Sequence, residues 1–214
     1  MTTPQAAPAT PATPTTPTNP ASGRVNQKRR THAAIVTAAA DLMLTGEEVT
    51  MPEVAKTALV SEATAYRYFP DLASLLSEAM ADTLPHPDQA FATVAGSTDP
   101  VERVAAAAEH LARHVLARQG AVRAMIAATI VRPNAAPPRP GLRFGLIDEA
   151  LRPLAEAANT DQEMLTHLKR DLSIVMGAEA LFSLMDLNGL PPEDAVASIV
   201  RTATTLTRAA VSAP

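Results

Sequence analysis

The segment 50–69 constrains the fold of this chain most, because it contains two helix starts close together. Thr50 precedes Glu53 at the spacing of a capping box, and Pro52 stands in the first turn, where its missing N–H costs little. Ser61 is a good N-cap for a second short helix. The sequence therefore predicts two short helices joined by a tight turn.

Apolar stripes at helical spacing flank these two short helices on both sides. The upstream stripe is Ile35, Val36, Ala39, Leu42 and Met43, and the downstream stripe is Leu72, Leu75, Leu76, Ala79 and Met80. A short helix between such neighbours suits a helix-turn-helix that presents its second helix to a DNA major groove. We expect an N-terminal three-helix helix-turn-helix domain over 26–83.

The rest of the chain predicts further helices. Apolar residues make up 47% of the sequence and aromatic residues only 3%, with Ala and Leu dominant, which favours helix over sheet. Periodicity places helices at about 100–118, 121–131, 142–157, 161–187 and 191–211. The fold class is therefore expected to be all-α, with a C-terminal helical bundle over 84–214.

The first 25 residues differ from everything that follows. Residues 1–23 carry no charge, and proline recurs at every third position from Pro8 to Pro20, the period of polyproline II. We expect 1–25 to form a disordered tail rich in Pro, Thr and Ala. A docking motif for an SH3-like partner is the less favoured alternative.

Several classes of protein are disfavoured by what the sequence lacks. The chain has no Cys, which excludes a disulfide framework, a thiolate metal site and a cysteine nucleophile. No apolar run reaches the ~20 residues of a membrane span, and no secretory signal is visible, so a cytoplasmic protein without membrane contact is expected. Catalytic elbows, phosphate loops and metal repeats are also missing, so we predict no enzyme, no cofactor and no metal; an enzyme on a helical bundle is a minor alternative.

The net charge of −4 hides a local basic cluster. Residues 24–71 contain six basic and six acidic side chains, whereas the remainder is acidic. Four of the basic residues lie together with no acid nearby: Arg24, Lys28, Arg29 and Arg30. Such a cluster attracts phosphate locally, although a solvated flank is the simpler alternative.

The second short helix carries an outward face suited to DNA. Ala65 and Phe69 are four residues apart and can face inward. The outward set is then Glu62, Ala63, Thr64, Tyr66, Arg67 and Tyr68. Phenolic hydroxyls and a guanidinium suit phosphates and base edges.

The same segment resembles the DNA-binding domain of the TetR family of regulators. The resemblance covers about 27–83, and its most specific part is Val60-Ser61-x-x-Thr64-x-Tyr66-x-Tyr68-Phe69, followed by the helix with Leu75 and Leu76. It implies DNA contacts at the residues already named and at the two caps: residues at the start of the second short helix would read bases, and the flanking residues would contact phosphates. The implied set is Lys28, Arg29, Arg30, Thr50, Ser61, Glu62, Ala63, Thr64, Tyr66, Arg67 and Tyr68.

The resemblance also implies a function: a homodimeric repressor that leaves a palindromic double-stranded DNA operator when an unknown small-molecule effector binds the C-terminal bundle. A helix-turn-helix regulator or interaction module without an effector is the alternative. The chain departs from the family at Leu59, where glycine is usual, and at Asp71 to Ala73, where lysine is frequent. Either a non-glycine residue tolerates the turn or the turn is remodelled. The missing lysine predicts modest non-specific DNA affinity and a shallow salt dependence.

Polar groups among apolar ones mark candidates for the effector pocket. The polar candidates are His110, His114, Thr129 and Glu179, and the possible apolar walls are Met125, Phe144, Met176 and Phe182. His110 and His114 have the spacing of a two-histidine metal pair, but no third ligand is fixed, and chance explains the pair better. Glu179 could recognise a cationic effector or pair with an arginine across an interface.

The segment 172–187 is apolar nearly all round, which predicts burial on two sides. One side can be the chain's own bundle and the other a second copy, with Gly177, Ala178 and Ala180 allowing close approach. The predicted dimer interface is Val175, Leu181, Val196, Ile199, Val200 and Ala203. The alternative is a monomer whose central helix is fully buried.

Overall fold

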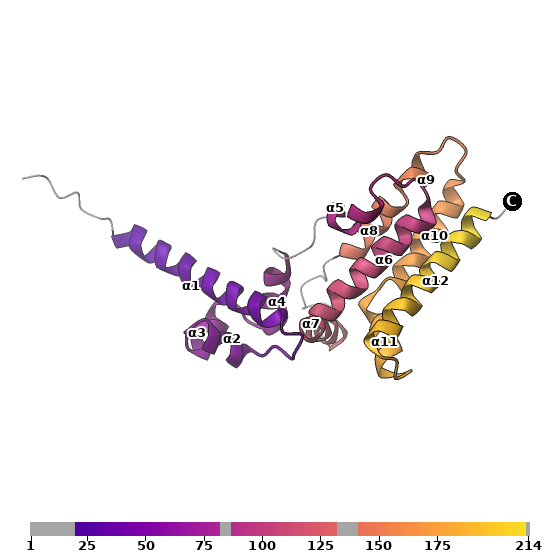
Figure 1. Cartoon of the computed structure of the whole chain (residues 1–214). Coiled ribbons are helices and arrows are strands. Elements are labelled where there is room, and N and C mark those ends of the chain that lie inside the picture. Colours follow the sequence, from indigo (N-terminus) through magenta and orange to yellow (C-terminus); the bar gives the residue numbers. More distant parts are fainter. Residues whose placement is uncertain (1–19, 82–86, 132–140, 213–214) are drawn as a thin grey trace, which may run out of the picture.

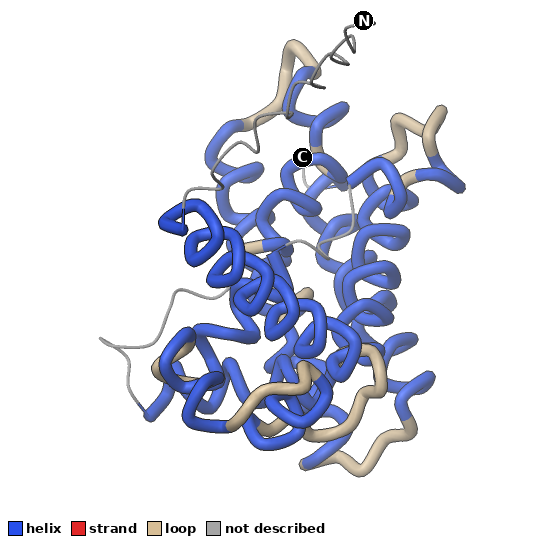
Figure 2. Tube along the Cα trace, turned by 90° about the vertical axis from the view of Figure 1, so that its left-hand side faces the viewer, coloured by secondary structure: helices blue, strands red, loops and turns tan. Residues whose placement is uncertain are grey.

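The computed structural model describes residues 20–81, 87–131 and 141–212, and within them the regular structure is entirely helical, as predicted (Figures 1 and 2). None of the described helices is long and apolar enough to cross a bilayer. The elements are α1 (Pro20–Met43), α2 (Met51–Thr57), α3 (Glu62–Tyr68), α4 (Leu72–Ala81), α5 (Pro87–Ala90), η1 (Ala92–Val94), α6 (Pro100–Ala117), α7 (Gln119–Val131), α8 (Leu142–Ala150), α9 (Arg152–Glu156), α10 (Gln162–Val175), α11 (Ala178–Asp186) and α12 (Pro192–Ser212).

The molecule has two parts that meet at α7. Helices α1 to α4 form one end, with the beginning of α1 extending away from it, and α6, α8, α10, α11 and α12 form the bundle at the other end (Figure 1). Both α1 and α4 pack against α7. Changes in the bundle can therefore reach the N-terminal helices through this helix.

The core of the bundle is built from small side chains. Helix α12 packs along α6 more extensively than any other pair of elements packs, and the buried contact positions include Ala107, Ala108, Ala195 and Ala203. Small residues let two helix axes approach closely. Arg103 connects α6 to the C-terminal end of α8. Its guanidinium donates hydrogen bonds to the carbonyl oxygens of Glu149 and Ala150, at 2.7 and 3.1 Å.

Helix α1 is longer than the sequence predicts. It begins at Pro20, so residues 20–25, expected in the disordered tail, are helical. Proline in the first turn of a helix removes no intrahelical hydrogen bond, so Pro20 can start the helix instead of preventing it. The remaining tail, 1–19, lies outside the described residues.

Two long predicted helices are broken in the structure. The helix expected over 142–157 divides at Leu151, just before Pro153, which stands in the first turn of α9. The helix expected over 161–187 divides at Met176 and Gly177 into α10 and α11. Ile174 and Leu187 are exposed, so this segment is not buried on all sides.

Most of the predicted dimer interface is instead part of the core of a single chain. Leu181, Val196, Ile199 and Ala203 are buried by the chain's own helices, because the inner face of α12 packs against α6, α10 and α11. Only Val175 and Val200 of the predicted set are half-buried. This corrects the sequence-based assignment for the four buried residues, which have no surface left for a partner.

Candidate DNA-binding surface and bundle cavity

Helix α3 turns one face inward and one outward. The inward orientation predicted for Ala65 and Phe69 is confirmed, since both are buried. The outward residues Glu62, Ala63, Tyr66 and Arg67 are exposed, and Thr64 and Tyr68 are half-buried. The predicted contact face is therefore available to DNA along its whole length.

Both predicted N-caps are present. The amide of Glu53 donates to Thr50 Oγ1 at 3.4 Å, and the amide of Thr50 donates to Glu53 Oε2 at 3.1 Å, which completes the capping box. Ser61 Oγ accepts from the amide of Thr64 at 3.2 Å and lies 2.9 Å from Thr64 Oγ1. Ser61 thus fixes the start of α3 and orients the hydroxyl of Thr64.

The turn between α2 and α3 keeps the backbone that glycine usually supplies. Leu59 has φ of +56°, the left-handed region, and its side chain is 91% exposed. A non-glycine residue there costs about 1–2 kcal/mol. The first of the two expected alternatives holds, since leucine tolerates the turn without remodelling it.

The basic residues of α1 lie beside the end of α3. Lys28, Arg29 and Arg30 are exposed and, with Tyr68, line an open hollow of about 830 Å³. Positive charge and a phenolic hydroxyl thus share one surface. The basic residues of α1 and Tyr68 of α3, which are all predicted to contact DNA, therefore lie together in the structure.

Sequence reasoning missed His32, which joins α1 to α3 and α4. Its ring lies 5.0 Å from the ring of Phe69 and 6.1 Å, edge-on, from that of Tyr68, and its Nε2 is 3.4 Å from Glu78 Oε1. The available signal was its position one helical turn after Lys28. His32 holds Tyr68 in place at the edge of the hollow.

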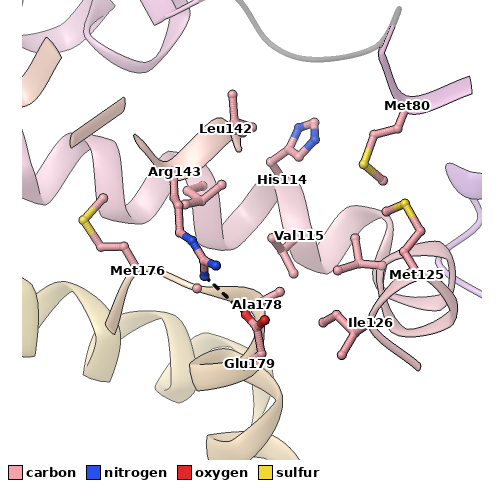
Figure 3. Close-up of a pocket in the computed structure, with 13 residues that line it drawn as sticks. Met80, His114, Val115, Met125, Ile126, Leu142, Arg143, Met176, Ala178 and Glu179 are labelled. Carbon is pink, nitrogen blue, oxygen red and sulfur yellow. Dashed lines mark hydrogen bonds and ion pairs between the residues drawn. The ribbon is translucent and has the colours of Figure 1, made fainter. Parts of the chain in front are cut away.

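The bundle contains a cavity of about 90 Å³ at the level of the helix break (Figure 3). Its lining comes from α4, α6, α7, α8 and the junction of α10 with α11: Met80, Leu111, His114, Val115, Val122, Met125, Ile126, Leu142, Arg143, Met176, Gly177, Ala178 and Glu179. Of the predicted pocket residues, the structure brings His114, Met125, Met176 and Glu179 together here. Arg143 and Met80 also line the cavity, although neither is among the predicted pocket residues.

The other predicted pocket residues lie elsewhere. Phe182 is buried beneath the guanidinium of Arg123, 3.9 Å from its ring centroid. The hydroxyl of Thr129 donates to a carbonyl of its own helix, Phe144 is exposed, and His110 lies one turn before His114 without lining the cavity. Helical spacing predicts which face of its own helix a residue lies on, but it does not predict which other element covers that face.

The partner of Glu179 belongs to the same chain. Arg143 Nη1 lies 3.3 Å from Glu179 Oε2, an ion pair across the cavity wall (Figure 3). The guanidinium rests against the α10–α11 junction, where a Cβ on Gly177 would lie 2.5 Å from Arg143 Nη1. The absence of a side chain at Gly177 therefore makes room for Arg143.

His114 presents a hydrogen-bond donor without a partner. Burial, reinforced by the charges of Arg118 and His110, lowers the pKa of His114 to about 4, so the ring is neutral at pH 7. Arg118 Nη1 can only donate, and it lies 3.2 Å from His114 Nδ1, so Nδ1 accepts and Nε2 carries the hydrogen. Nε2 is buried and finds no partner among the described residues.

His110 shares this environment. Burial also lowers the pKa of His110, and its Nε2 likewise lacks a hydrogen-bond partner in the described part of the chain. As for the metal pair considered from the spacing, residues 20–81, 87–131 and 141–212 contain no cluster of three or more ligating side chains. Three residues spaced four apart along α6 and its C-cap therefore each have a buried side-chain nitrogen without a hydrogen-bond partner among the described residues: His110, His114 and Arg118.

The loop between α1 and α2 packs tightly against the start of α7. A Cβ built on Gly120, at the start of α7, would lie 1.8 Å from the backbone oxygen of Glu47 in the loop between α1 and α2. Only glycine permits the two backbones to approach this closely. The α6–α7 corner and the 45–48 loop are therefore in direct main-chain contact.

Comparison with known proteins supports the assignment made from the helices. Residues 35–79 match the family model of bacterial regulatory proteins of the tetR family. A TetR transcriptional regulator from Rhodococcus sp. RHA1 is 26% identical, with 84% of this chain and 97% of that chain covered and a TM-score of 0.47. RolR, solved in complex with resorcinol, is 20% identical, with 86% and 95% covered and a TM-score of 0.49.

No curated protein matches the sequence. The family match spans the first stripe of α1, both caps, the exposed face of α3 and most of α4. These elements also form the candidate DNA-binding surface. Over residues 35–79, the helix-turn-helix of this chain therefore matches that of the bacterial regulatory proteins of the tetR family.

Proposed function

We propose that the protein is a ligand-responsive repressor, which binds a palindromic operator as a homodimer and is released by a small molecule in the bundle cavity. The observation that carries this proposal is Met80. Met80 belongs to α4, which packs on α1 in the DNA-binding domain, and its side chain also lines the cavity in the bundle. A molecule in the cavity would contact the DNA-binding part directly.

DNA binding would use the surface formed by α3 and the start of α1. Thr64 and Tyr66 are placed to meet base edges and backbone, and Lys28, Arg29 and Arg30 to meet phosphates. The two α3 helices of a dimer must lie roughly 34–36 Å apart to enter successive major grooves. A change in that separation would abolish simultaneous binding.

Release requires the effector to bind the DNA-incompetent conformation more tightly than the DNA-competent one. Two contacts can transmit the difference: Met80 on α4, and the main-chain contact between Gly120 and Glu47. Both connect the cavity-forming helices α6 and α7 to the DNA-binding domain. The effector would thereby alter how α1 to α4 sit on α7.

A homodimer would form through the end of α10 and the outward faces of α11 and α12. The inner faces are occupied within the chain, so the interface falls to apolar residues that remain half-buried or exposed: Val175, Leu184, Leu187 and Val200. A charged substitution at Val200 is expected to weaken dimerisation. Sedimentation of the variant beside the wild type would measure it.

The test is selection of DNA sites from a randomised duplex pool by the purified full chain, with a salt titration of the recovered site. A palindromic site bound by dimers, and released by a molecule that binds the cavity, would support the proposal. Recovery of no site by folded, ligand-free protein would overturn it. A shallow salt dependence is expected, because the domain is close to neutral.

A regulator without an effector is the second candidate. The small volume of the cavity favours it, since about 90 Å³ is less than the ~150 Å³ that holds a benzene molecule in an engineered cavity. If site-bound protein is released by none of the molecules that bind the cavity, this second function replaces the first.

A further inference from the structure

We infer that the bundle cavity takes a small apolar anion, a monocarboxylate in the simplest case, held by Arg143 at the α10–α11 junction. This inference rests on the proposed function for its biological role, because it names the class of the effector. The site itself stands on the cavity, the guanidinium and the donor atoms that meet there.

The walls of the cavity favour an apolar body. Most of its lining residues are aliphatic, and three of them are methionines, Met80, Met125 and Met176. Methionine side chains are flexible and adjust to the shape of a ligand. The volume of about 90 Å³ fits a short aliphatic chain, and a single ring would fit after the methionines move.

Arg143 provides the anchor for the charge. Its guanidinium is always protonated and offers a fork of donors that matches a carboxylate. Its Nη1 lies against Gly177 at the junction of α10 and α11. The guanidinium is thus held in place independently of any ligand.

Glu179 occupies the position that an anion would take. It contacts Arg143 through one oxygen at 3.3 Å, a long contact for a charged pair. The side chain of Glu179 is 43% exposed and that of Arg143 only 28%, so the carboxylate is the member that can turn toward water. A ligand carboxylate would replace it on the guanidinium.

Two further features favour an acceptor over a donor at this site. The Nε2–H of His114, which lines the cavity, is buried and has no partner among the residues that the structure describes. Helix α11 begins at the cavity, and its N-cap Gly177 provides no side-chain cap to its first amides. A carboxylate bound to Arg143 would meet donors, whereas an ammonium group would have to compete with the guanidinium of Arg143 for the carboxylate of Glu179.

The test uses probes of equal shape and different charge. Benzoate, benzamide and benzylamine, with butyrate, butyramide and butylamine as smaller counterparts, are titrated calorimetrically into the full chain without DNA. We expect a carboxylate to bind at least about tenfold more tightly than its amide or amine. Equal or tighter binding of the amine or the amide, or no carboxylate binding, would overturn the inference.

Three variants locate the site. Arg143→Gln is expected to weaken carboxylate binding about tenfold or more, and Glu179→Gln to strengthen it severalfold by removing the competing carboxylate. Arg113→Gln is the matched control, because Arg113 pairs with Glu109 and Glu193 at the surface and does not line the cavity. If Arg143→Gln does not fold, Arg143→Lys, which keeps the charge without the fork, should give an intermediate loss. Unchanged affinity in the folded Arg143 variant would refute the assignment.

The outcome is separable from that of the proposed function. A carboxylate that binds through Arg143 but leaves the operator complex intact would keep the site and remove the effector mechanism. Release of the operator by a neutral or cationic ligand would keep the mechanism and remove this assignment of the ligand class.

Discussion

The turn between α2 and α3 and the break between α10 and α11 both separate consecutive helices, but they do so by opposite means. At the turn, Leu59 adopts an unusual backbone conformation and leaves its side chain in solvent. At the break, Gly177 has an ordinary extended backbone, yet a side chain there would collide with Arg143. The turn thus contains an unusual backbone conformation, and the break contains a side-chain contact with another helix.

The same contrast separates the two functional regions. The DNA-binding surface displays hydroxyls and charges outward, fixed by the local caps at Thr50 and Ser61. The cavity is lined by His114, whose buried Nε2 has no hydrogen-bond partner among the described residues. The DNA-binding surface is exposed and can bind a hydrated, charged partner. The cavity requires a ligand that displaces water and forms hydrogen bonds with the buried donor.

Gly120→Ala should have the largest effect on stability, because it places a methyl group where the backbone of Glu47 already lies. We expect a loss of about 3 kcal/mol in the free energy of unfolding, together with weaker operator binding. Gly145→Ala is the control: it is also helical, and nothing lies within 4 Å of its Cβ position, so it should stabilise by up to about 1 kcal/mol. Urea denaturation measures both, and equal effects would show that the two parts do not meet at Gly120.

Tyr66→Ala and Thr64→Ala should each weaken binding to the selected operator by about tenfold or more, with the free energy of unfolding changed little. The side chain of Tyr66 is half exposed and makes no core contact that its removal would empty. Fluorescence anisotropy with labelled operator gives the affinities, and Arg113→Ala serves as a surface control. Wild-type affinity in both variants would contradict the assignment of α3 as the recognition helix.

The pH dependence of stability should reveal the buried imidazole. The pKa of His114 is about 4 in the folded chain, below its ordinary value of 6.5, so the unfolded chain binds the proton first as the pH falls. The stability present above about pH 6.5 is therefore lost progressively toward pH 4, by about 1–2 kcal/mol once partial solvent screening is allowed for. His114→Gln should flatten this part of the profile, measured by urea denaturation at several pH values. If this variant has the same pH profile as the wild type, the group that titrates is not His114.

Leu59→Gly should raise the free energy of unfolding by about 1 kcal/mol, because the strain of the left-handed backbone is relieved. Ala157→Gly provides the contrast, since Ala157 is also exposed but has φ of −71°. Glycine there should destabilise slightly by adding freedom to the unfolded chain. If both substitutions act alike, the turn carries no strain.

These experiments bear on what the sequence could reveal. The caps, the inward Ala65 and Phe69, and the all-helical class followed from spacings within a few residues, and all are present. The contact between Gly177 and Arg143 did not follow, because it joins residues far apart in the sequence. From the sequence alone, Gly177 in its apolar run predicts a close approach of two helices. In the structure, the guanidinium of Arg143 lies against it.

The pocket and the interface were harder to predict for the same reason. An apolar stripe shows that a face is buried but not by which element, so Val196, Ile199 and Ala203 were assigned to a second copy although the chain's own α6 and α10 bury them. Phe182 was assigned to the pocket, yet Arg123 covers it. Contacts between residues far apart in the sequence determine what buries each of these side chains, and a single sequence does not show which residues are in contact.

The contact between Gly120 and Glu47 bears on how this protein could be re-engineered. Exchanging its first 81 residues for another DNA-binding domain would leave α7 facing a foreign loop. The exchange would succeed only where that loop presents its main chain, without a protruding side chain, at the position of the Glu47 carbonyl. A chimera should therefore carry the 45–48 loop and the start of α7 as a single unit, so that the seam falls outside both.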